Sequence, residues 1–209
     1  MAPRPVVYVV DGDASVRVAV ESLLDAAGLE AKCFGSARDF LSAVSSVDVP
    51  TCLVLDVQLP GGSGLDLQRE LHARGSSLPI VFITGHADIQ TCVQAIKGGA
   101  VEFLLKPLRG RDLLAAIEKA LQAAREMRRE NAELADLRAS FDLLTPRERD
   151  VLELVVAGLL NKQIAYELGI SEVTVKIHRG QVMHKTGANS LADLVRMAER
   201  IKDRPPAPS

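Results

Sequence analysis

The sequence predicts an α/β domain with a doubly wound, flavodoxin-like parallel sheet, followed by a small all-α domain. In the first part of the chain, five short apolar runs alternate with segments of helical periodicity, and the connections between them are short. This alternation is typical of parallel strands with helices on both faces of the sheet. From residue 142 onward only helical patterns occur, and glycines separate them. We expect the five strands in the order 2-1-3-4-5.

The predicted strands are aliphatic, largely β-branched runs that end at polar or turn residues. They cover residues 6–10, 30–34, 52–56, 79–84 and 101–105. The third run is continuous, as in a strand buried on both faces, and it ends at Asp56. The segment that follows, residues 57–64, contains Pro60 and three glycines. We expect it to be a loop without helix or strand.

Apolar residues at helical spacing predict helices between and after the strands. The first four cover residues 15–27, 36–44, 65–73 and 88–97. Four more cover residues 147–157, 162–168, 172–185 and 191–201. Thr145 as N-cap, Pro146 at the first helical position and Glu148 form the pattern of a capping box at the start of this last group.

One long helix is predicted from residue 111 onward. Its apolar positions follow an approximate 4-3 heptad seam that consists of Ile117, Ala120, Ala124, Met127, Asn131, Leu134 and Phe141. The seam fits a linker helix whose apolar stripe packs on its own domain. It also fits a short dimeric coiled coil in which Asn131 sets the register. Both interpretations stay open.

These patterns divide the chain into a first domain at residues 1–122, a linker helix at 123–141, a second domain at 142–203 and a disordered, Pro-rich tail at 204–209. Residues 1–120 carry 11 Lys and Arg against 14 Asp and Glu, whereas residues 142–209 carry 10 against 9. Within the second domain, residues 171–187 are locally basic. The uneven charge favours two domains with different functions.

The sequence also argues against membrane insertion and secretion. No apolar run approaches the roughly 20 residues that span a bilayer, and the first residues lack the apolar segment of a signal peptide. Cys33, Cys52 and Cys92 show neither metal-site spacing nor a disulfide framework. We therefore expect a cytoplasmic protein without a membrane partner, whose cysteines are packed thiols.

Four polar residues end four of the predicted strands: Asp11, Asp56, Thr84 and Lys106. A doubly wound sheet brings these ends to one edge. Asp56 is a candidate nucleophile toward a phosphoryl group, and Asp11 can help to hold Mg²⁺. Lys106 and the Thr84 hydroxyl can each contact a phosphoryl oxygen. A single strand-end Asp is usually a turn residue or a cap, and a strand-end Lys is usually solvated, but four such residues on the right strands are far more specific.

The same residues, in their surrounding motifs, resemble the receiver domain of two-component response regulators. The motifs are LVLDVQLPGGSG around Asp56, VFITGH around Thr84 and LLKP around Lys106, and the resemblance covers residues 5–122. It implies that Asp56 accepts a phosphoryl group from a sensor histidine kinase, with Thr84 and Lys106 assisting. It also implies that Asp11, Asp56 and the backbone of Gln58 hold Mg²⁺.

The resemblance further implies a cis peptide bond between Lys106 and Pro107 and a switch pair formed by Thr84 and Phe103. In that switch the hydroxyl moves toward the phosphoryl group and the aromatic ring turns inward. The face formed by the fourth helix and the fifth strand then becomes a dimer surface.

Gly12 departs from the receiver pattern, because the family normally has a second acidic residue there that binds the metal directly. The next carboxylate belongs to Asp13. Either Asp13 reaches the metal, helped by the flexibility of Gly12, or the pocket has lost one ligand. We expect a Mg²⁺ site that is weakened but not abolished.

The second domain resembles the LuxR-type helix-turn-helix over residues 142 to about 201. The motif is LTPRERDVLELVVAGLLNKQIAYELGISEVTVKIHRGQVMHKTG. With the receiver in front, the whole chain resembles the FixJ-type response regulators, and most of all the branch with regulators of aromatic-compound catabolism and nodulation. Gly169 permits the turn between two helices, and Ser171 caps the second of them, whose N-terminal end is expected in the major groove of DNA.

The resemblance implies that base edges and phosphates are contacted from these two helices. The expected DNA-binding residues are Asn161, Lys162, Thr174, Lys176, Ile177, Arg179, Gly180 and Lys185. Val173, Val175 and Val182 are expected in the core. Gly180 is a second departure, because relatives usually carry a larger polar residue there. Its lack of a side chain predicts weaker discrimination at the facing base pair.

The leading hypothesis is a transcription regulator in which phosphorylation of Asp56 favours dimerisation and sequence-specific DNA binding. It is not an enzyme, apart from phosphorylation and dephosphorylation at Asp56. Its expected partners are a histidine kinase, a double-stranded DNA operator, a second copy of the chain and, as a further candidate, RNA polymerase. The alternative keeps DNA binding without phosphorylation, because of Gly12. A third hypothesis is a flavin-binding electron carrier. The sequence argues against it, because no Ser/Thr-rich phosphate loop follows the first strand. A purified protein without the colour of a flavin would dismiss this hypothesis.

Overall fold

The computed structural model describes residues 4–44, 49–86 and 88–203, which form two compact units. One unit ends at Arg128 and the other begins at Arg129. The tail predicted at residues 204–209 lies outside the described residues. In the part of the chain that the structure describes, no helix is both long and apolar enough to cross a membrane.

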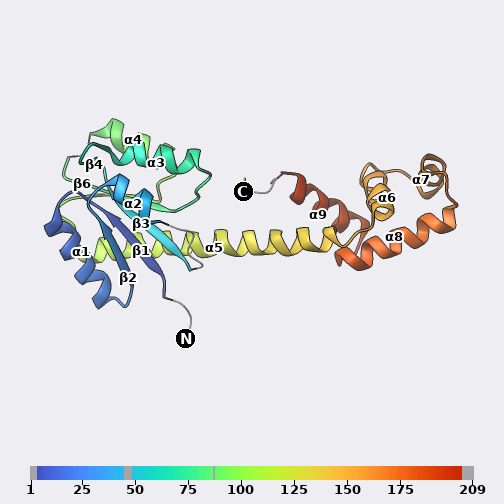
Figure 1. Ribbon diagram of the computed structural model, residues 1–209, viewed down its shortest axis with the longest axis horizontal. Helices are drawn as coiled ribbons and strands as arrows, with labels where there is room; N and C mark the ends of the chain where they lie inside the picture. Colours follow the sequence, from blue (N-terminus) through green and yellow to red (C-terminus); the bar gives the residue numbers. More distant parts are fainter. Residues whose placement is uncertain (1–3, 45–48, 87, 204–209) are drawn as a thin grey trace. The chain divides into compact units, whose positions relative to one another are not determined.

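The first unit is built on a five-stranded sheet in which all neighbouring strands are parallel (Figure 1). Its strands are β1 (Val6–Val10), β2 (Glu30–Phe34), β3 (Thr51–Asp56), β6 (Ile80–Thr84) and β7 (Glu102–Leu105). The order across the sheet is β2-β1-β3-β6-β7. This confirms the predicted order 2-1-3-4-5.

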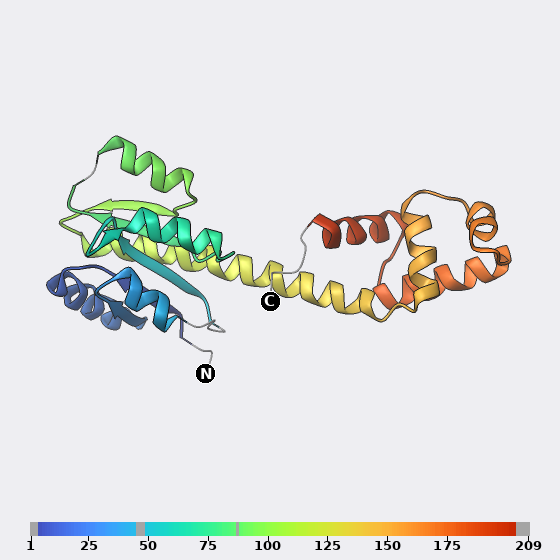
Figure 2. The same cartoon turned by 45° about the horizontal axis from the view of Figure 1, so that its top comes forward.

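Helices cover both faces of this sheet (Figure 2). They are α1 (Ala14–Ala26), α2 (Ala37–Ala43), α3 (Gly64–Ala73), α4 (Ile89–Lys97) and α5 (Gly110–Asp142). Side chains from α2, α3 and α4 form one core with alternate strand residues, and side chains from α1 and α5 form the other core with the remaining ones. β1, β3 and β6 are almost entirely buried as a result, which explains their continuous apolar sequence.

The expectation that residues 57–64 contain no strand is wrong. β4 (Gln58–Leu59) and β5 (Gly62–Ser63) pair as a small antiparallel hairpin. Gly61 adopts a φ of +78° in the turn, a conformation that glycine takes without steric strain. The next residue after the hairpin, Gly64, lies so close to β3 that an added Cβ would come within 2.2 Å of the Asp56 carbonyl oxygen. The hairpin thus returns the chain directly to the strand end that carries Asp56.

Part of the apolar seam of α5 is covered by residues of the chain itself. Ile117 and Ala120 belong to the core of the first unit, whereas Phe141 packs against the core of the second. Leu134 is buried, and its neighbour Glu133 forms an ion pair with Arg200. Asn131 in the middle of the seam is exposed, so the linker-helix and coiled-coil interpretations of the seam both stay open.

The second unit consists of the end of α5 and four helices, α6 (Pro146–Val156), α7 (Asn161–Leu168), α8 (Glu172–Thr186) and α9 (Leu191–Asp203). They enclose one apolar core with Ile164 and Val175 at its centre. The predicted capping box of Thr145 and Glu148 is present at the start of α6. Gly169 ends α7 with a φ of +64°, which permits the tight turn into α8.

Candidate functional site

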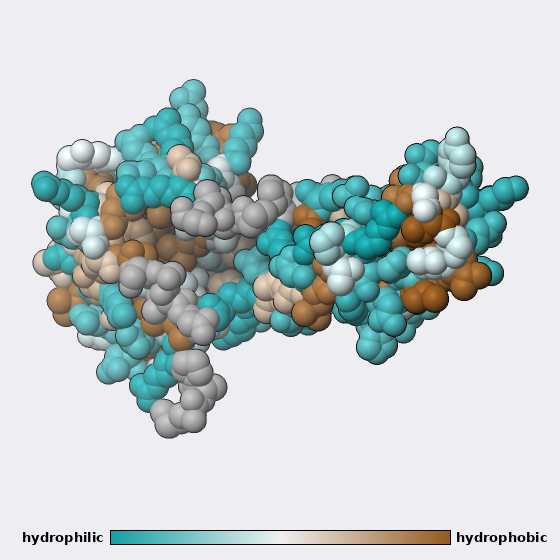
Figure 3. All heavy atoms as spheres, turned by 45° about the vertical axis from the view of Figure 1, so that its right-hand side comes forward, coloured by the Kyte–Doolittle hydropathy of each residue, from teal (hydrophilic) through white to brown (hydrophobic). Residues whose placement is uncertain are grey.

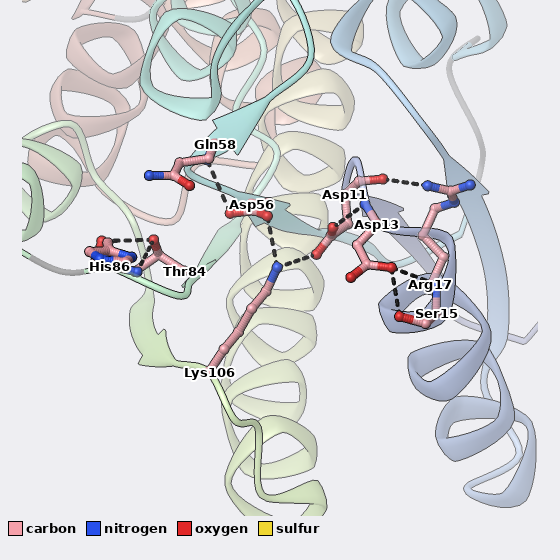
Figure 4. Close-up of polar contacts among 9 residues, drawn as sticks. All are labelled: Asp11, Asp13, Ser15, Arg17, Asp56, Gln58, Thr84, His86 and Lys106. Atoms are coloured by element: carbon pink, nitrogen blue, oxygen red, sulfur yellow. Dashed lines mark hydrogen bonds and ion pairs between the residues drawn. The ribbon is translucent and has the colours of Figure 1, made fainter.

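Polar side chains from four strands lie at the carboxyl edge of the sheet. Asp56 and Thr84 end β3 and β6, while Asp11 follows β1 and Lys106 follows β7. Because parallel strands pair in register, for example Asp56 with Ile83, their ends lie side by side. Figure 4 shows the side chains of Asp11, Asp56 and Lys106 pointing toward one another. The fold therefore brings into contact three of the four residues that the strand pattern predicted at this edge, Asp11, Asp56 and Lys106.

Lys106 bridges the two buried carboxylates. Its Nζ lies 2.7 Å from Asp11 Oδ2 and 2.7 Å from Asp56 Oδ2. Burial acts to lower the pKa of Lys106, but its hydrogen bonds to Asp11 and Asp56 outweigh this effect, so that the pKa is raised above its usual value. The ammonium group therefore stays charged and compensates for the repulsion of two carboxylates that water barely reaches. The peptide bond that follows, Lys106-Pro107, is cis, as predicted.

The second carboxylate oxygen of Asp56 is oriented by the adjacent loop. The backbone N–H of Gln58 donates to Asp56 Oδ1 at 3.0 Å, and Gln58 opens the β4–β5 hairpin. Asp56 is 7% exposed, so it is buried along its strand but not closed off. A carboxylate held this way, beside a fixed ammonium group, has the features of a phosphoryl acceptor.

Asp13 is engaged at the start of α1. It is the N-cap of α1, and its Oδ1 accepts hydrogen bonds from the Ser15 N–H at 2.8 Å and the Ser15 hydroxyl at 2.6 Å. These bonds lower the pKa of Asp13 below its usual value. The capping role explains why Asp13 stays on the helix, because an N-cap acceptor satisfies N–H groups that have no partner within the helix.

The remaining donors fit a magnesium ion with a small protein ligand set. Among the described residues, no cluster of three or more Asp, Glu, His or Cys side chains is arranged to hold a metal. Two carboxylates, Asp11 and Asp56, share Lys106, and the backbone of Gln58 lies beside Asp56. Mg²⁺ usually takes only one or two carboxylates and keeps several water molecules, so this set suits it.

Gly12 is in close contact with the loop that follows β3. An added Cβ at this position would lie 2.9 Å from Pro60 Cδ and 3.1 Å from Pro60 Cγ. A larger residue at position 12 therefore requires a shift of the proline ring, which has little freedom to move. Position 12 is therefore tightly packed against Pro60.

The expected switch residues, Thr84 and Phe103, have other partners in this structure. The Thr84 hydroxyl donates to the carbonyl of His86 at 2.8 Å and accepts from the His86 N–H at 3.2 Å (Figure 4). Phe103 is half-buried, and its ring centroid lies 6.3 Å from that of Phe82. The Thr84 hydroxyl is thus bonded to its own loop rather than to the carboxylate.

Sequence reasoning missed Arg17, whose Nη1 donates to the backbone carbonyl of Asp11 at 2.7 Å. An arginine one turn into a predicted helix has no pattern that announces such a contact. The capping role of Asp13 did have a signal, since an Asp immediately before a helix, two residues ahead of a Ser, is a common N-cap arrangement.

A second candidate site lies on α7 and α8, where the DNA-binding residues were expected. Lys162, Lys176, Ile177 and Gly180 are exposed, while Asn161, Thr174, Arg179 and Lys185 are half-buried. Around Gly180, an added Cβ would meet no atom within 4 Å, so the helix is open to solvent there. Val175 and Val182 are core residues as expected.

The expectation that Val173 is a core residue is wrong. It is 66% exposed and lies in the first turn of α8, one turn before the exposed Ile177. The side of α8 that faces the core carries Val175 and Val182, and Val173 lies on the side that faces away from it.

Polar contacts of Arg179 and Lys185 hold α8 against the rest of the unit. Arg179 Nη1 donates to Asn161 Oδ1 at 2.8 Å, which joins α8 to the start of α7. Lys185 Nζ lies 2.7 Å from Glu148 Oε2, which also accepts from the Thr145 N–H at 2.8 Å. The hydrogen bond from Lys185, and to a smaller extent that from Thr145, lowers the pKa of Glu148 below its usual value. Lys185, which was expected to contact DNA, therefore has an internal partner.

Two families match the two parts of the chain. Residues 7–118 match the family described as the response regulator receiver domain. Residues 142–198 match the bacterial regulatory proteins of the luxR family. The two matches lie on the two compact units described above.

Several curated proteins and solved structures are similar to nearly the whole chain. Nodulation protein W of Bradyrhizobium diazoefficiens is 50% identical over 198 residues, which are 95% of this chain and 87% of that protein. Transcriptional regulatory protein FixJ of the same species is 42% identical over 96% of this chain and 97% of that protein. The structure of response regulator StyR is 47% identical, with a TM-score of 0.80, and the match covers 95% of this chain and 100% of that one.

The capping role of Asp13 predicts different results for two substitutions. Asp13→Ala removes the cap and should lower the free energy of unfolding by about 1 kcal/mol. Asp13→Asn keeps a capping oxygen and should be nearly neutral. Since Asp13 is engaged as the cap of α1, we expect neither variant to change the Mg²⁺ dissociation constant measured by calorimetry. A higher Mg²⁺ dissociation constant in both variants would instead identify Asp13 as a metal ligand.

Proposed function

Because the chain belongs to the two-component response regulators that join a receiver domain to a LuxR-type DNA-binding domain, we propose that phosphorylation of Asp56 controls its dimerisation and its binding to an operator. Members of this family are transcription regulators and not catalytic enzymes. A receiver domain implies a histidine kinase as partner, and a helix-turn-helix implies DNA. The observation that carries the proposal is the Lys106 bridge between Asp11 and Asp56.

The proposed reaction is the transfer of a phosphoryl group from a phosphohistidine of the kinase to Asp56. An Asp56 oxygen forms the new O–P bond while the N–P bond of the phosphohistidine breaks, and the histidine leaves with the bonding electron pair. Lys106 Nζ, now 2.7 Å from Asp56 Oδ2, is close enough to donate to an oxygen of the incoming group. The released Thr84 hydroxyl can donate to a second oxygen once it leaves the carbonyl of His86.

A receiver domain typically binds Mg²⁺, and we propose that binding is weakened in this chain. Asp11, Asp56 and the backbone of Gln58 would hold the ion, which supplies positive charge where the phosphoryl group transfers. Gly12 contributes no carboxylate, and Asp13 is engaged as a helix cap. With one anionic ligand fewer, the affinity for a divalent cation should fall, since ligand charge is a main determinant of such affinities.

We assign the proposed dimer surface to α4 and β7. Ile89, Val93 and Ile96 lie at helical spacing along α4 and are exposed, Ile89 by 84%. Leu105 at the end of β7 is also exposed. Figure 3 shows apolar side chains at the surface of both units. An apolar stripe of this kind is typical of a surface that a partner covers, and a second copy of the chain is the proposed partner.

DNA contact is proposed for the exposed side of α8 and the start of α7. Lys176 and Ile177 are placed to face base edges, and Lys162 to face a phosphate. Gly180 offers no side chain for a base contact, so weak discrimination is proposed there. Lys185 can reach a phosphate only if it gives up its bond to Glu148. Because one domain neutralises few phosphates, two copies on adjacent half-sites should bind much better than one.

The alternative function keeps DNA binding without phosphorylation. It is favoured by the same observations at Gly12 and Asp13, if two carboxylates hold too little Mg²⁺ for transfer to occur. Dimerisation would then follow protein concentration or another ligand. For either function, the proposed boundaries are a receiver domain at 1–122, a linker helix at 123–141 and a DNA-binding domain at 142–203, in a cytoplasmic protein.

Phosphorylation can be tested with Mg²⁺ and a small phosphodonor. Intact mass spectrometry should show one added phosphoryl group that is absent in Asp56→Asn, and light scattering should show a shift from monomer to dimer. Ile96→Arg places a charge on the proposed dimer surface, so it should accept the phosphoryl group but stay monomeric. No added mass even at high Mg²⁺ would support the alternative function.

DNA contacts can be separated by the salt dependence of binding to a duplex selected from a random library. Lys162→Ala should reduce the slope of log affinity against log salt by about 1, because one phosphate contact is lost. Lys185→Ala should leave the slope unchanged and lower the stability of the second unit, because its partner is Glu148. Equal loss of slope in both variants would make Lys185 a phosphate contact. In the same duplex, base changes opposite Gly180 should have little effect.

A further inference from the structure

The loop between β1 and α1 is held by a contact from outside the pocket. Arg17, in the second turn of α1, donates from Nη1 to the backbone carbonyl of Asp11 at 2.7 Å. In Figure 4, Arg17 and Lys106 approach Asp11 from opposite sides. The guanidinium also lies over Gly35, after β2, where an added Cβ would be 3.7 Å from Nη1. Arg17 therefore spans the ends of β1 and β2.

Arg17 completes the hydrogen bonding of Asp11. The Asp11 N–H donates to the Phe34 carbonyl at 3.2 Å, Oδ1 accepts from the Asp13 N–H at 2.8 Å, and Oδ2 accepts from Lys106. With the bond from Arg17 to its carbonyl, both backbone groups and both carboxylate oxygens of Asp11 have partners. The position of the carboxylate thus depends on the backbone on either side of it.

That backbone has a weak point, because the next residue is Gly12. Glycine has a wider range of backbone conformations than any other residue, so the peptide group between Asp11 and Gly12 is poorly restrained by its own chemistry. The carbonyl of this same peptide group is the acceptor for Arg17. A hydrogen bond from a charged donor is stronger than one between neutral groups, and the planar guanidinium fixes its direction.

We propose that Arg17 is a positioning residue, which fixes the peptide group between Asp11 and Gly12 and thereby holds the Asp11 carboxylate in place for a divalent cation. The inference rests on the proposed function, in which Asp11 helps to hold the metal at the phosphorylation site. It assigns to Arg17 a role in the pocket although its guanidinium bonds the backbone behind the carboxylate.

The test is the binding of Mn²⁺, a probe for the Mg²⁺ site, to the full-length chain without phosphodonor. Arg17→Met keeps the length of the side chain and removes the donor. Calorimetry should show a dissociation constant about tenfold weaker, as is typical when a residue behind a metal ligand is changed. In the metal-free protein, the Asp13 amide should exchange faster, because it is bonded to Asp11 Oδ1, whereas the amides of β6 should not change. Arg17→Lys keeps the charge, and its Mn²⁺ dissociation constant should lie between those of the wild-type chain and Arg17→Met.

Arg38→Met is the matched control, because it makes the same change in charge at an exposed residue of α2. Equal weakening by Arg38→Met and Arg17→Met would mean that net charge is responsible, and the inference would be overturned. Unchanged Mn²⁺ affinity and Asp13 exchange in Arg17→Met would overturn it as well. If the wild-type chain takes up neither Mn²⁺ nor a phosphoryl group, the proposed function fails, and the exchange of the Asp13 amide alone then decides the positioning role.

Discussion

The ion pairs of Lys106 with Asp11 and Asp56 are the interaction on which the receiver unit depends. Three aliphatic strands carry these charges to one edge of the sheet, where two buried carboxylates would repel each other without the ammonium group. The same contacts constrain what the site can do. The Lys106 ammonium has three N–H donors, and two of them are bonded to carboxylates, so a phosphoryl oxygen that enters is an acceptor of the right charge for it.

Much of the first unit follows from local patterns in the sequence. Strand ends at Asp11, Asp56, Thr84 and Lys106 are visible because parallel strands alternate with helices over short connections. What cannot be predicted from such patterns is the choice a side chain makes among nearby partners. Asp13 uses its side chain to cap α1. The residues around Pro60 form a hairpin, and the pairing of its two strands depends on the path by which the loop returns to β3.

In the second unit the sequence predicts the helices, but not which of their polar side chains are free for DNA. Lys185 is bound to Glu148 at the start of α6, and Arg179 is bound to Asn161 at the start of α7. These bonds depend on the crossing of helices far apart in the sequence. The side of α8 that faces the core also depends on how the helices cross, which is why the prediction that Val173 is a core residue is wrong. The two contacts fix α8 as a rigid element, which leaves Lys176 and Ile177 exposed on it.

We propose that Asp11, Asp56 and the backbone of Gln58 hold Mg²⁺ weakly but sufficiently for phosphoryl transfer, and a calorimetric titration of Mg²⁺ is the direct test. Gly12→Asp restores a third carboxylate, and Pro60→Ala in the same chain makes room for its Cβ. We expect measurable Mg²⁺ binding by the wild-type chain, and binding about tenfold tighter by the double variant than by Pro60→Ala alone. Equal affinity with and without the added carboxylate, or no binding by the wild-type chain at all, would contradict it.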